Sequence, residues 1–239
     1  MTTKITLQMS TTRKFKVMKL KAILFGSIGT LIETSEIQRR AFNQAFSEAK
    51  LGWDWDVEAY REMLTKSGGL ERIQDFANQC GTLVDVNQLH QRKTEIFNTF
   101  MNEKSIPLRS GVSNLISYAK DHGLKLGFVT ATSEANVNAV FRTLSDNIVR
   151  SDFNFISNGS MITKPKPSPD IYQKALTMLC LDPQECIAIE DTAISMKAAL
   201  AANIRCIAFP GEFAQENDFN GAQSITKKLT PDILHSNEG

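Results

Sequence analysis

The sequence has few of the side chains that build metal centres or disulfide frameworks. Of its 239 residues, three are histidine and four are cysteine. No two cysteines stand at metal-ligand spacing, and no histidine neighbours a motif considered below. These residues are Cys80, Cys180, Cys186, Cys206, His90, His122 and His235. We therefore expect reduced thiols in or near the core, and neither a zinc site nor a histidine-activated nucleophile.

An excess of one charge and a long apolar run are both missing as well. The net charge is +1 with 22% charged residues, so we expect no nucleic-acid partner. No apolar run is long enough to span a bilayer, so we expect no membrane partner. A chain of this length with 42% hydrophobic residues can bury the core of one large domain, or of a domain that carries an insertion.

The first 20 residues contain no acid, although they carry Lys4, Arg13, Lys14, Lys16 and Lys19. This bias is typical of an organelle transit peptide. However, Met18 begins the compact segment "MKLKAILF", which favours an extended or misassigned start with residues 1–17 as an N-terminal extension. We expect a cytoplasmic protein, with a plastid location as the alternative.

Short apolar segments alternate with helical patterns along the chain. This alternation predicts an α/β fold, a doubly wound parallel sheet with helices on both faces. Gly123 and Asn203 are expected to end two of the helices, and Ser168 to cap the start of a third. The segments expected as strands are 20–25, 124–129, 153–157, 186–189 and 205–209.

The span between the first two expected strands is unusual, because residues 35–106 show helical patterns and no strand pattern. Ser35 with Gln38 resembles a capping box, and Asp56 and Asp85 are expected to cap two further helices. The helices are expected at 38–49, 57–66, 70–80 and 86–104. We interpret residues 35–106 as a helical cap domain inserted into a core made of residues 18–34 and 107–239.

Polar segments follow four of the expected strands, at the edge where open parallel sheets bind ligands. They are "GSIGTL" (26–31), "TATS" (130–133), "KPSPDIY" (166–172) and "EDT" (190–192). Their order and spacing resemble the haloacid dehalogenase superfamily, and most of all its branch of β-phosphoglucomutases and CbbY-type sugar-phosphate phosphatases. The segments "SGGLER" (67–72), "QRKTEIF" (91–97) and "PLRSGV" (107–112) are also similar to that branch. The resemblance covers nearly all of the chain after Met18.

The resemblance implies a site made from both parts of the chain. It places phosphate contacts at Thr130, Thr132 and Lys166, Mg²⁺ ligands at Glu190 and Asp191, and cap contacts to a sugar or second phosphate at Arg72 and Lys93. Hydroxyl and ammonium groups donate to phosphate oxygens, and Mg²⁺ prefers oxygen ligands. For Arg72 and Lys93, solvated helix charges are an equally good interpretation. Without ligand, Lys166 is expected to pair with an acidic neighbour.

Two residues depart from the pattern of the superfamily, in which the first strand ends in Asp-x-Asp-Gly-Thr. The resemblance implies a nucleophilic aspartate at position 26 and an acid–base aspartate at position 28. The sequence has Gly26 and Ile28, whose side chains cannot attack phosphorus, ionise or donate a proton. No catalytic residue of the ordinary aspartyl-phosphate mechanism is therefore expected to act, and Mg²⁺ binding is expected to be weakened.

Three hypotheses about function follow from this resemblance. The first is an inactive pseudo-phosphatase that binds a phosphorylated sugar or another anion. The second is a phosphohydrolase with an altered mechanism, which uses water on a metal ion held by Glu190 and Asp191. The third is a protein that binds and regulates an active relative.

Overall fold

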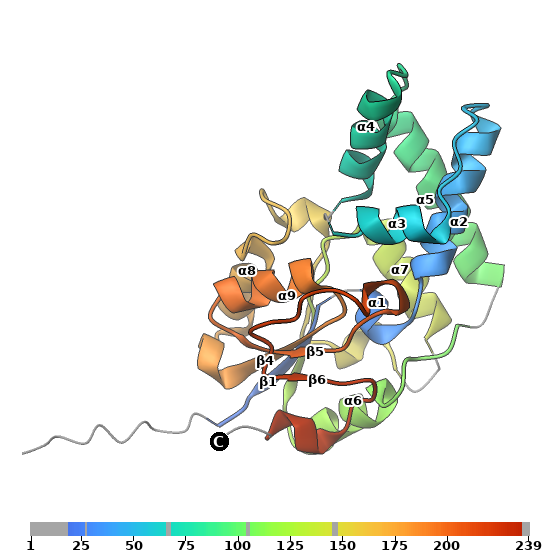
Figure 1. The fold of residues 1–239 in the computed structure, drawn as a ribbon. Helices are drawn as coiled ribbons and strands as arrows, with labels where there is room; N and C mark the ends of the chain where they lie inside the picture. The colour runs from blue at the N-terminus through green and yellow to red at the C-terminus, as the bar shows by residue number, and fades with distance from the viewer. Residues whose placement is uncertain (1–18, 27, 66–67, 104–105, 145–147, 236–239) are drawn as a thin grey trace, which may run out of the picture.

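The protein forms a six-stranded parallel sheet with helices on both faces (Figure 1). The computed structural model describes residues 19–26, 28–65, 68–103, 106–144 and 148–235. The N-terminal extension, Ser27 and the expected helix ends at Lys66 and Lys104 lie outside these residues. The strand order is β3-β2-β1-β4-β5-β6. The strands are β1 (Ala22–Phe25), β2 (Lys125–Phe128), β3 (Phe155–Ile156), β4 (Cys186–Glu190), β5 (Arg205–Ala208) and β6 (Ser224–Ile225).

The expected doubly wound architecture is confirmed, and alternation along β1 shows how it arises. Ile23 and Phe25 belong to one buried hydrophobic cluster, whereas Ala22 and Leu24 belong to another. Because successive side chains of a strand point to opposite faces, the two clusters lie on the two sides of the sheet. All four residues have no exposed surface, as expected of a central strand in a parallel sheet.

The helices of the core divide between these two faces. α6 (Val112–Asp121) and α7 (Glu134–Thr143) bury residues in the first cluster. α8 (Asp170–Leu179) and α9 (Ala193–Ala201) bury residues in the second. Short 3₁₀ turns complete the core at 150–152, 159–161, 183–185, 212–214 and 231–234. Each helix thus packs an apolar face against the sheet. Such packing, more than intrinsic helix propensity, provides most of the stability of helices in proteins.

The described residues between β1 and β2 contain helices and no strand, as the sequence indicates. After α1 (Ile28–Leu31) come α2 (Ser35–Glu48), α3 (Val57–Met63), α4 (Gly69–Cys80) and α5 (Val86–Glu103). α2 to α5 form a lobe at the upper right of Figure 1, which we call the proposed cap. Its core is aromatic, with the Trp55 ring 4.8 Å from Phe42 and 4.7 Å from Phe46, centroid to centroid.

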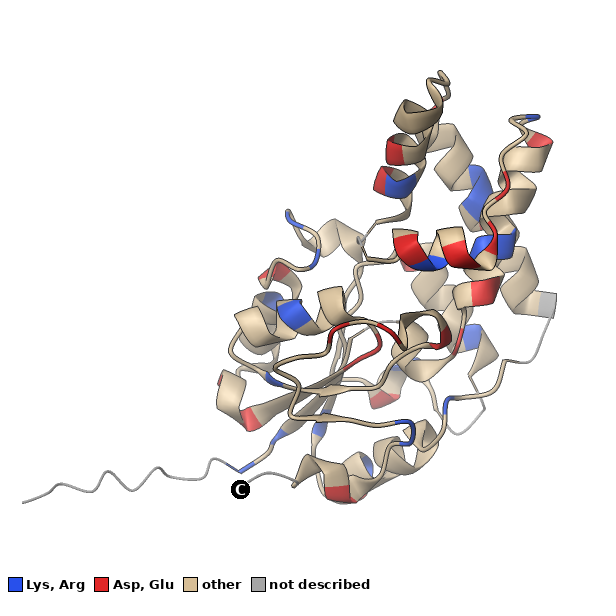
Figure 2. Cartoon of the chain, viewed as in Figure 1, with Lys and Arg blue, Asp and Glu red and all other residues tan. Residues whose placement is uncertain are grey.

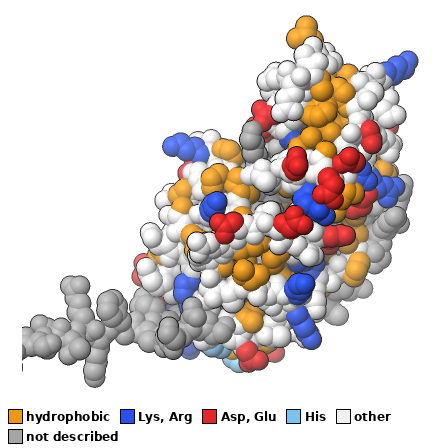
Figure 3. Space-filling model, in the orientation of Figure 1, with side chains coloured by type: hydrophobic (Ala, Val, Ile, Leu, Met, Phe, Trp, Pro, Cys, Tyr) orange, Lys and Arg blue, Asp and Glu red, His pale blue; other side chains and the backbone are white. Residues whose placement is uncertain are grey.

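The surface of the proposed cap is mixed in character. Acidic and basic residues are interleaved along α3 and α4 (Figure 2). Apolar side chains gather on the same lobe (Figure 3). Leu83, between α4 and α5, is fully exposed. No helix in the described ranges is both long and apolar enough to cross a membrane.

Four of the expected helix ends are confirmed by the geometry. Asp56 accepts a hydrogen bond from the Ala59 N–H at 2.8 Å, and Asp85 accepts one from the Gln88 N–H at 3.0 Å. Gly123 and Asn203 adopt left-handed backbone angles, with φ of 66° and 60°, just after α6 and α9. Asp side chains that cap helix starts and residues with positive φ that end helices are therefore read correctly at these four positions.

Two expected caps are wrong. α2 starts at Ser35 itself, and Thr34 at its N-cap makes no side-chain capping bond. α8 starts at Asp170, and the Ser168 hydroxyl donates to the Asp170 carboxylate at 2.5 Å instead of capping the helix. The expected core positions of the cysteines hold for Cys186 and Cys206 only, because Cys80 and Cys180 are exposed at helix ends.

Candidate functional site

A cleft of about 520 Å³ lies between the carboxyl ends of the strands and the proposed cap. It contains most of the residues that the sequence singled out. Thr130, Thr132, Lys166 and Asp191 line it from the core, and Arg72 and Lys93 from the proposed cap. Glu190 lies beneath the cleft with no exposed surface. The fold therefore brings the expected residues together, while their roles in binding stay predictions.

A buried ion pair lies below the floor of the cleft. The Lys166 ammonium donates to Glu190 Oε1 at 2.6 Å and to the Gly26 carbonyl at 2.7 Å. The Tyr172 hydroxyl also donates to Glu190 Oε1, at 2.6 Å. Lys166 is 5% exposed and Glu190 is 0% exposed, so solvent barely screens the pair. The expected pairing of Lys166 with an acid is confirmed.

The carboxylate of Glu190 fills the space beside Gly26. A Cβ atom at position 26 would overlap both the Cδ and the Oε1 atoms of Glu190. Glu190 Oε2 has no hydrogen-bond partner among the described residues. Burial raises the pKa of Glu190 to about 6, and the neighbouring Lys166 opposes that rise. Glycine at position 26 thus permits a carboxylate from β4 to lie at the end of β1.

The Mg²⁺ site expected from the resemblance does not fit these side chains as they are placed. The Asp191 carboxylate lies beside Gly29, where a Cβ atom would overlap its Oδ2, whereas Glu190 lies beside Gly26. Glu190 is enclosed by Lys166 and Tyr172. In the described part of the chain, no three His, Cys, Asp or Glu residues are grouped as metal ligands would be. In this arrangement the Glu190 carboxylate is engaged by Lys166 and Tyr172, and Asp191 is the acid that lines the cleft.

The loop after β2 carries the expected phosphate contacts. The Thr132 N–H donates to the Thr130 hydroxyl at 3.3 Å, and the Asn136 amide donates to the Thr132 hydroxyl at 2.7 Å. Ser133 caps α7 by accepting from the Asn136 N–H at 3.3 Å. A helix N-terminus of this kind favours an anion, because its first N–H groups lack partners within the helix. Asn136, which also lines the cleft, carries no sequence signal beyond its place in the first turn of α7.

On the cap side of the cleft, a lysine is buried among aromatic rings. Lys93 is 4% exposed, and its ammonium lies 4.5 Å from the Phe42 ring centroid and 5.2 Å from that of Phe97. It donates a hydrogen bond to Gln38 Oε1. Burial, with a smaller contribution from the Arg72 charge, lowers the pKa of Lys93 to about 7. Lys93 is therefore not the solvated helix charge that was one interpretation of the sequence.

Two neighbours of Lys93 extend this side of the site. The Arg72 guanidinium donates to the Met63 carbonyl at 3.2 Å and lies 5.4 Å from the Tyr60 ring centroid. His90 lines the cleft as well, so the expectation that no histidine neighbours a motif is wrong. Burial lowers the pKa of His90, and the charge of Lys93 lowers it further. The i, i+3 spacing of His90 and Lys93 on α5 is the signal that could have revealed this proximity.

Comparison with known proteins supports the resemblance independently. The model of the haloacid dehalogenase-like hydrolase family matches residues 23–209. The chain belongs to this family. It is 42% identical to Protein CbbY of Cereibacter sphaeroides over 209 residues, which are 86% of this chain and 91% of that protein. The expected placement in the CbbY-type branch is therefore confirmed.

Solved structures agree with this placement. The crystal structure of CbbY from Rhodobacter sphaeroides in complex with phosphate has a TM-score of 0.82 and 40% identity, covering 87% of this chain and 94% of that one. A mutant of that CbbY in complex with xylulose-(1,5)bisphosphate gives the same values. β-Phosphoglucomutase from Clostridium difficile shares the fold, with a TM-score of 0.74 at 20% identity, over 90% of this chain and 96% of that one.

The buried ammonium of Lys93 makes a prediction about stability. Its pKa is lower in the folded chain than in the unfolded chain, so the unfolded state binds more protons between about pH 7 and pH 10.5. The cost of burying Lys93 is thus constant below pH 7 and declines above it. We expect Lys93→Met to raise the free energy of unfolding at pH 6, by an amount that shrinks as the pH rises to 10.

Urea unfolding at several pH values measures this difference. Lys174→Met is the matched control, because Lys174 is exposed on α8, and its effect should not change with pH in this way. If Lys93→Met raises the free energy of unfolding by the same amount at pH 6 and pH 10, the lowered pKa of Lys93 is contradicted.

Proposed function

We propose that the protein binds a phosphorylated sugar or a similar anion in the cleft and does not hydrolyse it through an aspartyl-phosphate. The observation that carries the proposal is the composition of the cleft. Lys166 and Thr130 from the core and Lys93 from the proposed cap reach one hollow, while Gly26 and Ile28 supply no ionisable group at the end of β1. Donors without a nucleophile favour binding over covalent transfer.

Two features support a ligand with anionic groups at both ends. Basic side chains line the cleft from both sides: Lys166 comes from the core, and Arg72 and Lys93 come from the proposed cap. The related CbbY of Rhodobacter sphaeroides has been crystallised with phosphate and, as a mutant, with xylulose-(1,5)bisphosphate. A sugar bisphosphate of that kind is therefore the first ligand to test.

The metal-water hypothesis has less support from the geometry. It needs Glu190 and Asp191 to share one ion, but the Glu190 carboxylate is buried and bonded to Lys166 and Tyr172. Ile28, which is 7% exposed, occupies the position where an acid–base group is implied. The proposed binding function needs neither a shared metal ion nor a proton donor at that position.

Isothermal titration with xylulose-1,5-bisphosphate tests the proposal. The unaltered protein should bind, and Lys166→Met should weaken binding, because hydrogen bonds to charged groups contribute about 1.5–3 kcal/mol. Lys164→Met is the matched control, since Lys164 is exposed on the same loop and should bind like the unaltered chain. Thr130→Val keeps the ion pair intact and should also bind more weakly. It decides the test if Lys166→Met does not fold. Unchanged binding by folded Thr130→Val and Lys166→Met would refute the assigned site.

A second experiment supplies the two missing carboxylates. The double change Gly26→Asp and Ile28→Asp should recover some phosphate release with magnesium, because the two groups act as nucleophile and proton shuttle in one mechanism. Each single change should do little. An aspartate at position 26 also forces Glu190 to move, because its Cβ overlaps that carboxylate. A folded double variant that binds the ligand and releases no phosphate would show that the site has diverged beyond these two positions.

A further inference from the structure

The loop after β5 touches both segments that join the core to the proposed cap. We call residues 209–214 the β5 loop. The first linker, residues 32–34, leads from α1 into α2, and the second, residues 106–111, leads from α5 back into α6. The linkers lie side by side, since Ile32 and Leu108 form an antiparallel bridge. Any change in the orientation of the proposed cap must pass through this pair of segments.

Arg109 connects the second linker to α1 and to the β5 loop of the core. Its Nη1 donates to the Gly29 carbonyl at 2.7 Å and to the Phe209 carbonyl at 2.8 Å. Its Nη2 donates to the Pro210 carbonyl at 2.5 Å, and its guanidinium lies 3.5 Å from the Phe209 ring centroid. The Arg109 N–H donates to the Leu31 carbonyl at 2.8 Å. One side chain thus holds α1 and the β5 loop against the second linker of the proposed cap.

Glu33 makes the corresponding contact from the first linker. Its Oε2 accepts from the Glu212 N–H in the β5 loop at 2.7 Å. Its Oε1 accepts from the N–H of Ser35, the first residue of α2, at 2.9 Å. A carboxylate that accepts two backbone donors is a charge-assisted arrangement with little freedom. The start of α2 is therefore connected to the β5 loop through a single side chain.

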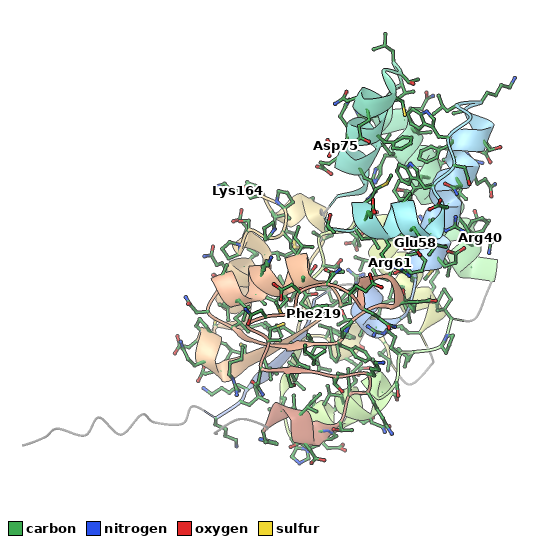
Figure 4. The ribbon with its side chains drawn as sticks, viewed as in Figure 1. Arg40, Glu58, Arg61, Asp75, Lys164 and Phe219 are labelled. Carbon is green, nitrogen blue, oxygen red and sulfur yellow. The ribbon has the colours of Figure 1, made fainter. Side chains whose placement is uncertain are left out.

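The β5 loop also reaches the proposed cap and the cleft directly. The Phe213 ring lies edge-on to Tyr60 of α3, with centroids 6.1 Å apart. Arg61 of α3 lies 5.8 Å from the Phe213 ring centroid, and Figure 4 shows Arg61 and Glu58 on α3 beside this loop. Gly211 and Ala214 line the cleft. The loop thus connects core, linkers, cap and site.

We propose that Arg109 and Glu33 are positioning residues that fix the orientation of the proposed cap through the β5 loop. A second contact already exists where α5 packs against α7. Hinges are a few loop or element-terminal residues that absorb changes of φ and ψ, so contacts that hold both linkers restrict rotation of the proposed cap about the α5–α7 contact. The guanidinium of Arg109 serves this purpose well, because its donors have a rigid, planar arrangement that lysine lacks.

The native cysteines allow a direct test that needs no ligand. Cys80 is exposed at the end of α4 in the proposed cap, and Cys180 is exposed at the end of α8 in the core, whereas Cys186 and Cys206 are buried in the sheet. Nitroxide labels on Cys80 and Cys180 report the distance between the two parts in a double electron–electron resonance experiment. We expect a single narrow distribution for the unaltered chain. In the Arg109→Met variant this distance distribution should become broad or show a second population.

Glu33→Gln serves as the second variant, because it keeps one oxygen acceptor and removes one contact, so a smaller broadening is expected. Arg205→Met is the matched control, since Arg205 is exposed at the start of β5 and should leave the distribution unchanged. Circular dichroism establishes which variants are folded. If Arg109→Met does not fold, Glu33→Gln decides the question. A folded Arg109→Met variant with the narrow distance distribution of the unaltered chain would overturn the proposal. If Arg109→Met is unfolded, a Glu33→Gln variant with an unchanged distance distribution would overturn it as well.

Discussion

The buried ion pair between Lys166 and Glu190 joins three segments that are remote in sequence. Glu190 ends β4, and Lys166 belongs to the loop before α8. The Gly26 carbonyl that Lys166 also contacts follows directly after β1. Removing one member of such a pair leaves an uncompensated charge, which typically costs about 3–5 kcal/mol. Tyr172 adds a hydrogen bond to the same carboxylate oxygen. The floor of the cleft is therefore held in place by one charged cluster.

Glycine at position 26 is the condition for this arrangement. A larger side chain there would overlap the Glu190 carboxylate, so the residue and the placement of the acid depend on each other. In the same placement the Glu190 carboxylate is engaged by Lys166 and Tyr172, so it is not open to a magnesium ion. Anion binding remains compatible with the cleft, because Thr130, the start of α7 and the cations of the proposed cap do not depend on a metal ion.

Much of this structure could be predicted from local sequence signals, and the misses lie where burial is low or where a long-range contact intervenes. Buried apolar runs identified β1, β2, β4 and β5 within two residues at each end, because central parallel strands are apolar on both faces. The two-residue β6 was missed because Ser224 and Ile225 are not buried. The Ser35–Gln38 capping box is absent because α2 already begins at Ser35, and the Gln38 side chain instead accepts from Lys93, 55 residues away. Long-range contacts of this kind override local capping preferences and leave no periodic trace in the sequence.

The proposed function has two parts: the cleft binds a phosphorylated sugar, and the protein does not cleave it. Phosphorus-31 nuclear magnetic resonance of xylulose-1,5-bisphosphate mixed with the unaltered protein and magnesium tests both parts in one sample. We expect the ester resonances to broaden or shift when protein is added, and no inorganic phosphate resonance to grow with time. Steady, magnesium-dependent growth of inorganic phosphate would contradict the proposed function, because neither Gly26 nor Ile28 can supply a nucleophile or a proton.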